Sequence, residues 1–218
     1  MNTLDYIIND IKPFDISAHI RDAQHSFNKL TYSHIPVLEK NEFVGNLSET
    51  DVHCFETEKP LSEYRYALEP FHVKEHTNWI DILEAFALNN SNIMPVLDDK
   101  NNYLGYFELN DIMNIFNETP FLSEAGGIIV VEKGVTDYSF SEMCQIVESN
   151  DAKILGLFIS KLENDIMQAT IKIGHTGMNA IVQTFRRYSY NVVSNHGEDK
   201  LLEDLKKRSE YLDRYLNM

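Results

Sequence analysis

The stretch Ile35-Pro36-Val37-Leu38 is followed by Gly45-Asn46-Leu47-Ser48-Glu49-Thr50-Asp51, and the same pattern returns further along the chain. The second copy reads Met94-Pro95-Val96-Leu97 and then Gly105-Tyr106-Phe107-Glu108-Leu109-Asn110-Asp111. Each copy predicts an apolar strand, a turn, a second apolar strand that begins with glycine, and a helix with an acid in its first turn. Half of such a repeat cannot bury its own apolar face, so we expect the two copies to pack around a pseudo-twofold axis.

The two copies align over more than these motifs. Pro36 matches Pro95 at an offset of 59, whereas Asp51 matches Asp111 at an offset of 60, because the turn at 98–102 holds one extra residue. A brief strand and an apolar-spaced helix precede each motif, so each copy reads strand, helix, strand, strand, helix. Clefts at the seam between two such copies are natural sites for small molecules.

Other elements flank the repeat. The sequence predicts a short N-terminal helix over 4–11. Residues 126–195 predict strand, helix, strand, strand, helix, strand, which is the order of a ferredoxin-like domain. From 196 to 218, leucines recur at spacings of three and four, which is typical of a coiled-coil helix that pairs with a twin or packs on its own subunit.

We therefore predict an α/β (α+β) protein in three parts. The tandem repeat covers 1–120, with copies at about 10–58 and 67–118, a ferredoxin-like domain covers 126–195, and a C-terminal helix covers 196–218. Hydrophobic residues make up 43% of the 218 residues. That share is enough for a sizeable core and argues against disorder.

The chain is strongly acidic, and its charge is unevenly placed. The formal net charge is −15, and residues 1–120 hold 20 acidic residues against 8 lysines and arginines. A field of this sign repels phosphate backbones, so we expect no binding of nucleic acid. The two cysteines form no disulfide or metal pattern, and the N-terminus carries no secretory signal. The longest apolar runs are too short to span a bilayer, so we expect a cytoplasmic protein without membrane contact.

The repeat resembles a tandem pair of cystathionine-β-synthase (CBS) domains, often called a Bateman module. The apolar-Pro-Val strand and the Gly-apolar-apolar-Ser/Thr-x-x-Asp ending carry the resemblance, which covers about residues 10–118. In that family the final Asp commonly grips the ribose hydroxyls of an adenine nucleotide, and the Ser or Thr three residues earlier helps to hold ribose or phosphate. The resemblance implies a ligand-sensing module, with AMP, ADP, ATP or S-adenosylmethionine as the ligands to test.

In this chain, the resemblance implies ligand-binding roles for the acid and the hydroxyl residue of the motif and for the residues beside the apolar-Pro-Val strand, which flank the base. The positions are Asp51, Ser48, Ile35, His34, Asp111 and Met94. His34 directly precedes the first apolar-Pro-Val strand, and we align it with Asn92 in the second copy. Glu108 stands where the second copy would need Ser or Thr, and it would face a phosphate with like charge.

The order of elements in 126–195 resembles an ACT-like regulatory domain. A CBS pair followed by an ACT-like domain resembles the acetoin-utilisation regulatory proteins of bacteria. This resemblance implies a regulatory protein rather than an enzyme, which forms a homodimer through its ACT-like domain and C-terminal helix.

Other interpretations stay open at this point. Ser48 and Asp51 also fit a capping box, which contributes about 1 kcal/mol without any ligand. The alternative function is a structural oligomerisation module with no small-molecule ligand. Catalysis is not expected, because the sequence has no nucleophile elbow and no P-loop. A metal site is not expected either, because His72 and His76 lie four apart in extended chain, where that spacing does not converge.

Overall fold

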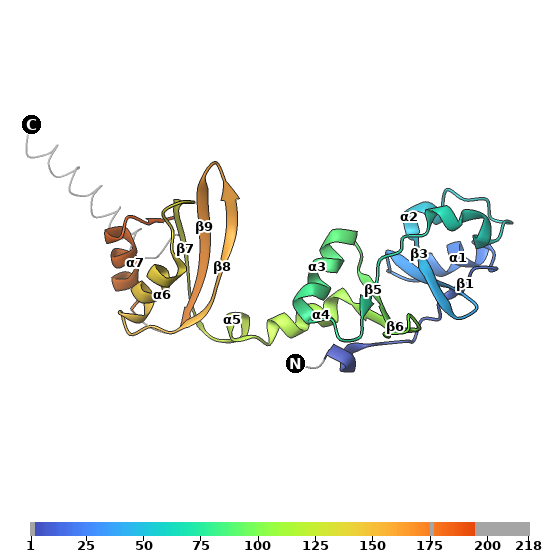
Figure 1. Ribbon diagram of the computed structural model, residues 1–218, viewed down its shortest axis with the longest axis horizontal. Helices are drawn as coiled ribbons and strands as arrows, with labels where there is room; N and C mark the ends of the chain where they lie inside the picture. Colours follow the sequence, from blue (N-terminus) through green and yellow to red (C-terminus); the bar gives the residue numbers. More distant parts are fainter. Residues whose placement is uncertain (1–2, 175–176, 195–218) are drawn as a thin grey trace, which may run out of the picture. The chain divides into compact units, whose positions relative to one another are not determined.

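The computed structural model describes residues 3–174 and 177–194, and the chain divides into two compact units, Met1–Asn117 and Glu118–Met218 (Figure 1). Both units are mixed α/β, which confirms the fold class predicted from the sequence. The helix predicted over 196–218 lies outside the described residues. Within the described part of the chain, no helix has both the length and the apolar character needed to cross a membrane.

The first unit contains two copies of one arrangement, each with a strand, a helix, two further strands and a helix. The first copy consists of β1 (Phe14–Asp15), α1 (Ile20–Phe27), β2 (His34–Glu39), β3 (Glu42–Ser48) and α2 (Glu49–Val52). The second consists of β4 (Val73–Lys74), α3 (Trp79–Asn89), β5 (Ile93–Leu97), β6 (Tyr103–Glu108) and α4 (Leu109–Asn117). Two 3₁₀ helices, η1 (Thr3–Tyr6) and η2 (Leu61–Ala67), precede the first and the second copy.

The sheets of the two copies have equivalent topology and register. Each copy forms a three-stranded sheet, in which a parallel pair is followed by an antiparallel hairpin. Pro36 lies opposite Asn46 in the first hairpin, and Pro95 lies opposite Tyr106 in the second. Both hairpins also have a register shift two residues after this pair. The repeat predicted from the sequence is therefore present in the structure.

The segments that precede the two copies cross over between them. The backbone of Ile8, ahead of the first copy, exchanges hydrogen bonds of 3.0 and 2.9 Å with Tyr106 of the second copy. The backbone of Glu69, ahead of the second copy, exchanges hydrogen bonds of 2.9 and 2.7 Å with Asn46 of the first. The N-terminal helix predicted over 4–11 is therefore wrong beyond the single turn of η1, because the chain at Ile8 is extended against β6.

This crossing explains the glycine of each motif. Gly45 and Gly105 have φ angles of +146° and +154°, which side-chain-bearing residues rarely adopt. A Cβ on Gly105 would lie 2.4 Å from the carbonyl oxygen of Ile8, and one on Gly45 would lie 2.9 Å from the Cβ of Leu68. Glycine is needed because a neighbouring backbone passes directly over the strand at this point.

The second unit has a ferredoxin-like fold. Its elements are α5 (Pro120–Ser123), β7 (Gly126–Gly134), α6 (Phe140–Glu148), β8 (Ile154–Glu163), β9 (Ile166–Gly174), α7 (Met178–Arg187) and β10 (Asn191–Val192). The sheet is antiparallel with strand order β10-β7-β9-β8, and its core joins one sheet face to apolar residues of α6 and α7. Asn164 and Asp165 form the turn between β8 and β9 with φ angles of 52° and 59°, as a two-residue type I′ turn requires.

Candidate functional site

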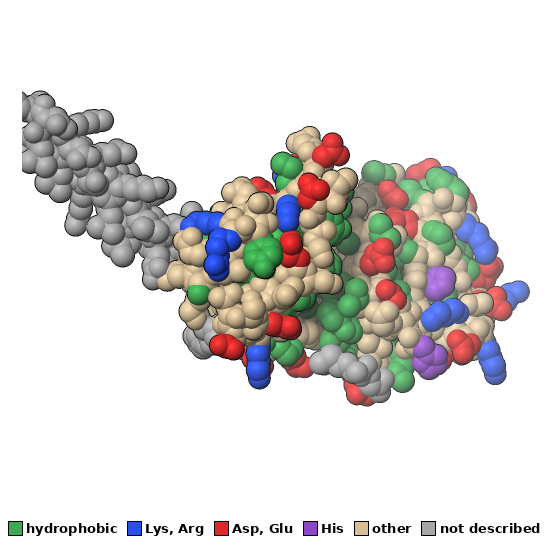
Figure 2. All heavy atoms as spheres, turned by 60° about the vertical axis from the view of Figure 1, so that its left-hand side comes forward, with side chains coloured by type: hydrophobic (Ala, Val, Ile, Leu, Met, Phe, Trp, Pro, Cys, Tyr) green, Lys and Arg blue, Asp and Glu red, His purple; other side chains and the backbone are tan. Residues whose placement is uncertain are grey.

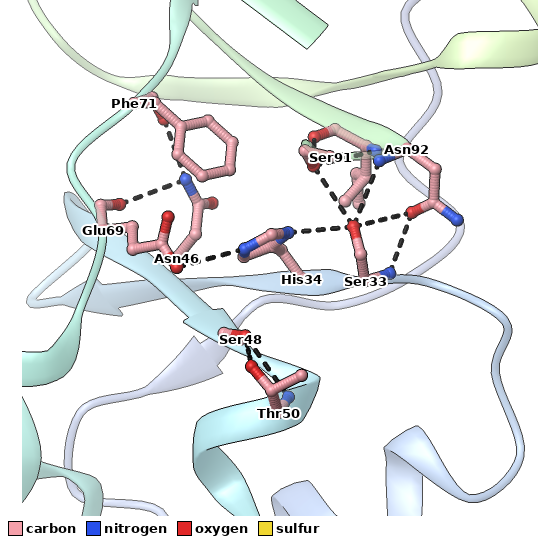
Figure 3. Close-up of polar contacts among 10 residues, drawn as sticks. Ser33, His34, Asn46, Ser48, Thr50, Glu69, Phe71, Ser91 and Asn92 are labelled. Carbon is pink, nitrogen blue, oxygen red and sulfur yellow. Dashed lines mark hydrogen bonds and ion pairs between the residues drawn. The ribbon is translucent and has the colours of Figure 1, made fainter. Parts of the chain in front are cut away.

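Side chains alternate between the two faces of the sheet along the hairpin of each copy. Ile35 is buried in the core of the first copy, and Met94 is buried in the core of the second. Two of the predicted site residues can therefore offer a ligand only their backbone atoms. The opposite face of the first hairpin carries His34, Asn46 and Ser48, because His34 pairs across the strands with Ser48. This face meets residues from the second copy and from the linker, and we call the boundary between the copies the seam (Figure 3).

A reciprocal pair of hydrogen bonds marks the pseudo-twofold axis at the centre of the seam. The Ser33 N–H donates to Asn92 Oδ1 at 2.8 Å, and the Asn92 N–H donates to Ser33 Oγ at 3.1 Å. Asn92 Nδ2 also donates to the carbonyl oxygen of Thr31 at 2.8 Å. Ser33 and Asn92 are 59 residues apart, which is the offset of the repeat, so equivalent residues bind each other across the axis.

This pairing corrects the alignment of His34 with Asn92. The residue equivalent to His34 is Ile93, since Ser33 is the counterpart of Asn92. His34 is only 6% exposed, and both its ring nitrogens have partners: Ser33 Oγ at 2.9 Å and Glu69 Oε1 at 3.3 Å. Its ring also meets the ring of Phe71 edge to face, with centroids 5.1 Å apart. His34 therefore helps to hold the seam together before any ligand binds.

The motif that ends the first copy forms half of the capping box. Ser48 is the N-cap of α2, and its hydroxyl accepts from the N–H of Thr50 at 3.3 Å and lies 2.7 Å from the Thr50 hydroxyl. Asp51 is half-buried, and its carboxylate makes no hydrogen bond or ion pair with another described residue. Because α2 has only four residues, its dipole is small. The dipole would therefore contribute little to the binding of a phosphate at this helix.

The corresponding position in the second copy is occupied by the chain's own side chains. Tyr32, from the first copy, donates its hydroxyl to the Glu108 carboxylate, and Tyr106 donates its hydroxyl to Asp10. Burial is the main cause that raises the pKa of both tyrosines, and these carboxylates add to the effect. A cavity of about 180 Å³ remains there, lined by Thr31, Tyr32, Asn92, Glu108, Leu109 and Asn110. Asp111 is half-buried one residue beyond this lining, and like Asp51 it has no partner for its carboxylate among the described residues.

The two sides of the seam therefore differ in side-chain size. Tyr32 corresponds to Ser91 at the repeat offset, so a tyrosine reaches the second motif where the first motif meets a serine. The Ser91 hydroxyl lies 3.4 Å from that of Ser33, close to His34 (Figure 3). The position from which a tyrosine reaches Glu108 of the second motif thus holds only a serine on the side of the first motif, and the Ser91 hydroxyl donates to the carbonyl oxygen of Ile93 at 2.5 Å.

Sequence reasoning missed one further polar group of the seam. The side chain of Asn46 is fully buried, and its Nδ2 donates to the carbonyl oxygens of Glu69 at 3.2 Å and Phe71 at 2.8 Å. These two bonds fix the orientation of the amide, and they leave Oδ1 buried without a donor among the described residues. The signal was available in the repeat, because a polar Asn takes the place that Tyr106 fills in the second copy.

We expect Asn92→Ala to lower the free energy of unfolding of the first unit by about 2 kcal/mol, because it leaves the Ser33 N–H and the Thr31 carbonyl without their partners. Urea denaturation would measure the loss. Asn110→Ala is the matched control, since Asn110 is exposed and its side chain bonds to no described residue. That control should stay within about 0.5 kcal/mol of the parent. Equal losses in both variants would contradict the seam role of Asn92.

One family model and several solved structures are similar to parts of this chain. Residues 5–53 and 65–118 match the family model of the CBS domain. The chain is similar to the crystal structure of a CBS domain pair/ACT domain protein from Thermotoga maritima, with 19% identity, a TM-score of 0.49, and coverage of 54% of this chain and 98% of that one. It is also similar to CBSX2 in complex with AMP, at 14% identity, a TM-score of 0.45, and coverage of 53% and 95%. A third similar structure is the cytosolic domain of the Mg²⁺ channel MgtE in complex with ATP, at 16% identity, a TM-score of 0.41, and coverage of 47% and 44%. No significant match to a curated protein is found.

Proposed function

We propose, from the premise that residues 5–53 and 65–118 are a tandem pair of CBS domains, that the first unit senses an adenosine-type nucleotide at its seam. The protein would act as a regulator and not as an enzyme. The first motif, with Asp51 and Ser48, is the binding position that we favour. The second motif, with Asp111, is the weaker one.

The main support for this proposal is that the Asp51 carboxylate has no hydrogen-bond or ion-pair partner among the described residues. It is half-buried at the end of a run of polar groups that includes the hydroxyls of Ser48 and Thr50. A carboxylate can accept from two vicinal hydroxyl groups, which is what a ribose offers. The second motif supports the choice by contrast, because Glu108 there would repel a phosphate and already binds Tyr32.

Charge limits the kind of nucleotide. Residues 1–120 hold 20 acids against 8 lysines and arginines, and acidic side chains lie scattered over the face shown in Figure 2. A triphosphate would need several cations to offset its charge. We therefore favour a nucleoside or a monophosphate over ATP.

The unpaired oxygen of Asn46 suggests how the base is recognised. A buried acceptor without a donor costs about 1–3 kcal/mol, so a ligand N–H that reaches it gains that amount. Asn46 and Ser48 are on the same face of β3, two residues apart, and Asp51 follows in the next turn. Asn46 is fully buried, so a donor reaches this oxygen only when binding moves the residues that cover it; with the ribose at Asp51, we assign that donor to the exocyclic amine of adenine. AMP should therefore bind more tightly than IMP, which lacks that amine.

Binding at the seam offers a route to regulation. The reciprocal bonds of Ser33 and Asn92 and the crossing segments at Ile8 and Glu69 are among the contacts that join the two copies. A ligand that contacts both copies favours one relative setting of them over others, and it can shift that balance only by its difference in affinity.

We expect Asp51→Ala to weaken nucleotide binding at least tenfold. A hydrogen bond to a charged group contributes about 1.5–3 kcal/mol, and each 1.4 kcal/mol is a factor of ten in the dissociation constant. Calorimetric titration of the full chain with AMP, IMP, ADP, ATP and S-adenosylmethionine would measure it. Asp111→Ala should have the smaller effect.

Glu84→Ala is the control for this experiment. It removes one negative charge from the exposed face of α3, where Glu84 has no partner among the described residues, and it should change the affinity less than twofold. Equal affinities for the parent and Asp51→Ala would refute the site. A parent that shows neither heat nor a thermal shift with any of these ligands would refute the nucleotide itself and favour the structural oligomerisation module.

The rest of the proposal concerns the second unit. We assign its ferredoxin-like fold to an ACT-like regulatory domain and suggest a cytoplasmic homodimer, as in the acetoin-utilisation regulators that the sequence resembles. One feature of the described structure supports self-association. Ile128 and Phe158, from β7 and β8, are 46% and 45% exposed on the sheet face opposite the helices. Exposed apolar side chains on a sheet face favour contact with another protein surface, although this face also carries Lys172 and Thr170 and Phe158 packs on Phe121.

A further inference from the structure

We propose that Glu75, His76 and Asp99 bind a divalent transition-metal cation. One ligand atom from each of these side chains lies within 4.8 Å of the other two. The Nε2 atom of His76 is 3.8 Å from the Glu75 carboxylate, and the carboxylate of Asp99 makes no hydrogen bond or ion pair with another described residue. This proposal does not depend on nucleotide binding at the seam.

The sheet of the second copy brings these residues together. β4 and β5 run parallel, with Lys74 opposite Leu97, so the residues after each strand emerge at the same edge. Glu75 and His76 follow β4, and Asp99 lies two residues after β5. The N–H of Glu75 donates to the carbonyl oxygen of Leu97 at 3.1 Å, which keeps the two chain segments adjacent. The cluster therefore rests on the paired ends of two strands.

The turn after β5 leaves Asp99 free for a ligand. The neighbouring Asp98 is fully used, because its carboxylate accepts from the N–H groups of Lys100 and Asn102, each at 2.8 Å. The side-chain bond from Asn102 is the main cause that lowers the pKa of Asp98. Lys74 Nζ clamps the turn by donating to the carbonyl oxygen of Asp98 at 2.7 Å and to Asn101 Oδ1 at 2.6 Å. The Lys74 ammonium group thus stabilises the turn and makes no ion pair with the Asp99 carboxylate.

The set of donors indicates the class of metal. One imidazole nitrogen with two carboxylate oxygens suits zinc or manganese better than calcium or magnesium, which prefer oxygen ligands alone. At bond lengths of about 2.0–2.2 Å, two ligand atoms of one tetrahedral zinc ion are about 3.5 Å apart. The side chains of His76 and Asp99 are exposed, so small rotations can close the set from 4.8 Å.

Space for the remaining coordination positions lies beside the cluster. A cavity of about 380 Å³ is lined by Glu75 and His76 together with residues of η1 and the start of α3. Three protein ligands with an open side are typical of zinc sites that also bind water or a small molecule. An ion here would join the segment after β4 to the turn after β5.

Sequence spacing could not reveal this cluster. His76 is adjacent to Glu75, but Asp99 comes 23 residues after His76 and belongs to a different turn. Spacing alone argues against a site formed by His72 and His76 together, and His72 has other partners in the structure. Its Nδ1 atom bonds the carbonyl oxygen of Pro70 at 3.0 Å, and its ring packs on Phe43. His72 is therefore the matched control for His76.

The test is titration of the EDTA-treated full chain with Zn²⁺, for the parent and three variants. We expect saturable binding to the parent, at least tenfold weaker binding to His76→Ala and to Asp99→Asn, and less than a twofold change for His72→Ala. Zn²⁺ should raise the thermal transition of the parent and not that of Asp99→Asn, because a bound ion stabilises the folded state. All four proteins keep their fold, since the changes are on exposed side chains.

A second measurement locates the ion. Mn²⁺ should broaden the amide resonances of both 75–77 and 98–100 at substoichiometric amounts, although these segments are distant in sequence. Broadening at one segment alone, equal Zn²⁺ affinities for the parent, His76→Ala and Asp99→Asn, or no saturable binding to the parent would each overturn the proposal. None of these outcomes bears on the nucleotide titration, because Asp51 is in the other copy.

Discussion

Gly105→Ala should lower the free energy of unfolding of the first unit by about 3 kcal/mol or more. Two costs add at this position. The φ angle of +154° is strained for alanine, and the new Cβ would lie 2.4 Å from the carbonyl oxygen of Ile8 and 2.7 Å from Cγ2 of Ile7. To relieve the contact, the N-terminal segment must leave β6, which breaks both backbone hydrogen bonds between Ile8 and Tyr106. Urea denaturation would measure the loss.

The equivalent glycine of the first copy provides a graded comparison. At Gly45 the nearest atom to a new Cβ is the Cβ of Leu68, at 2.9 Å, so the clash is milder and we expect a smaller loss than at Gly105. Gly177 is the control, because it has an ordinary φ of −62° and no atom within 4 Å of a new Cβ. Gly177 is in the second unit, so Gly177→Ala should leave the unfolding of the first unit unchanged. A loss at Gly105 no larger than that at Gly177 would show that the crossing segment contributes little to the fold.

Gly105 also shows which features of the fold the sequence predicts and which it does not. The repeat offset predicts the equivalent hairpins. In the structure Gly45 lies opposite Val37 in the first hairpin, and Gly105 lies opposite Val96 in the second. The sequence could not say why a glycine is needed, because the atoms that exclude a side chain come from a segment nearly a hundred residues away. Local patterns predict an element, whereas a backbone crossing is a tertiary contact with no local signal.

The prediction of an N-terminal helix over 4–11 was wrong for the same reason. The periodicity around Leu4 and Ile8 fits a helix, yet the backbone at Ile8 gains more by completing the sheet of the second copy. In the second unit the predicted order of elements agrees with the structure, although only β8 and β9 are paired neighbours in sequence and β7 pairs with the distant β9 and β10. The Asn164-Asp165 turn, for example, is both a local signal and the observed connection between β8 and β9.

The residues of the candidate site also divide into those that a local sequence motif predicts and those that only tertiary contacts reveal. Asp51 and Asp111 could be named from the sequence because they repeat within a motif, and Ser48 because it fits the Ser/Thr position of the CBS motif, although Glu108 takes its place in the second copy. The bonds between Ser33 and Asn92 could have been found from the offset of 59, but only once the pseudo-twofold axis was taken to pass between equivalent residues. The side chains that fill the second motif, above all Tyr32, come from the other copy and could not be placed without coordinates.

Phe185→Ala should destabilise the second unit by about 3–5 kcal/mol, the usual cost of removing a buried aromatic side chain. Phe185 is fully buried in the core between α7 and the sheet. Its ring meets that of Tyr190 edge to face, with centroids 5.5 Å apart. The loss should therefore exceed the area term alone, because an aromatic pair adds about 0.5–1.5 kcal/mol.

The damage should also reach the polar cluster around Tyr190. Lys133 Nζ lies 4.1 Å from the centre of the Tyr190 ring and donates to Glu142 at 2.9 Å, and burial and Glu142 raise the pKa of Tyr190 to about 12. Without Phe185 the Tyr190 ring loses one of its supports, so amide hydrogen exchange should rise in β7 and β10 and stay unchanged over residues 3–117. Phe140→Ala is the control, because Phe140 is 39% exposed and its loss should cost less than about 1 kcal/mol. A comparable loss in both variants would mean that the core of this unit is not centred on Phe185, and exchange that rose over residues 3–117 as well would mean that the two units do not unfold separately.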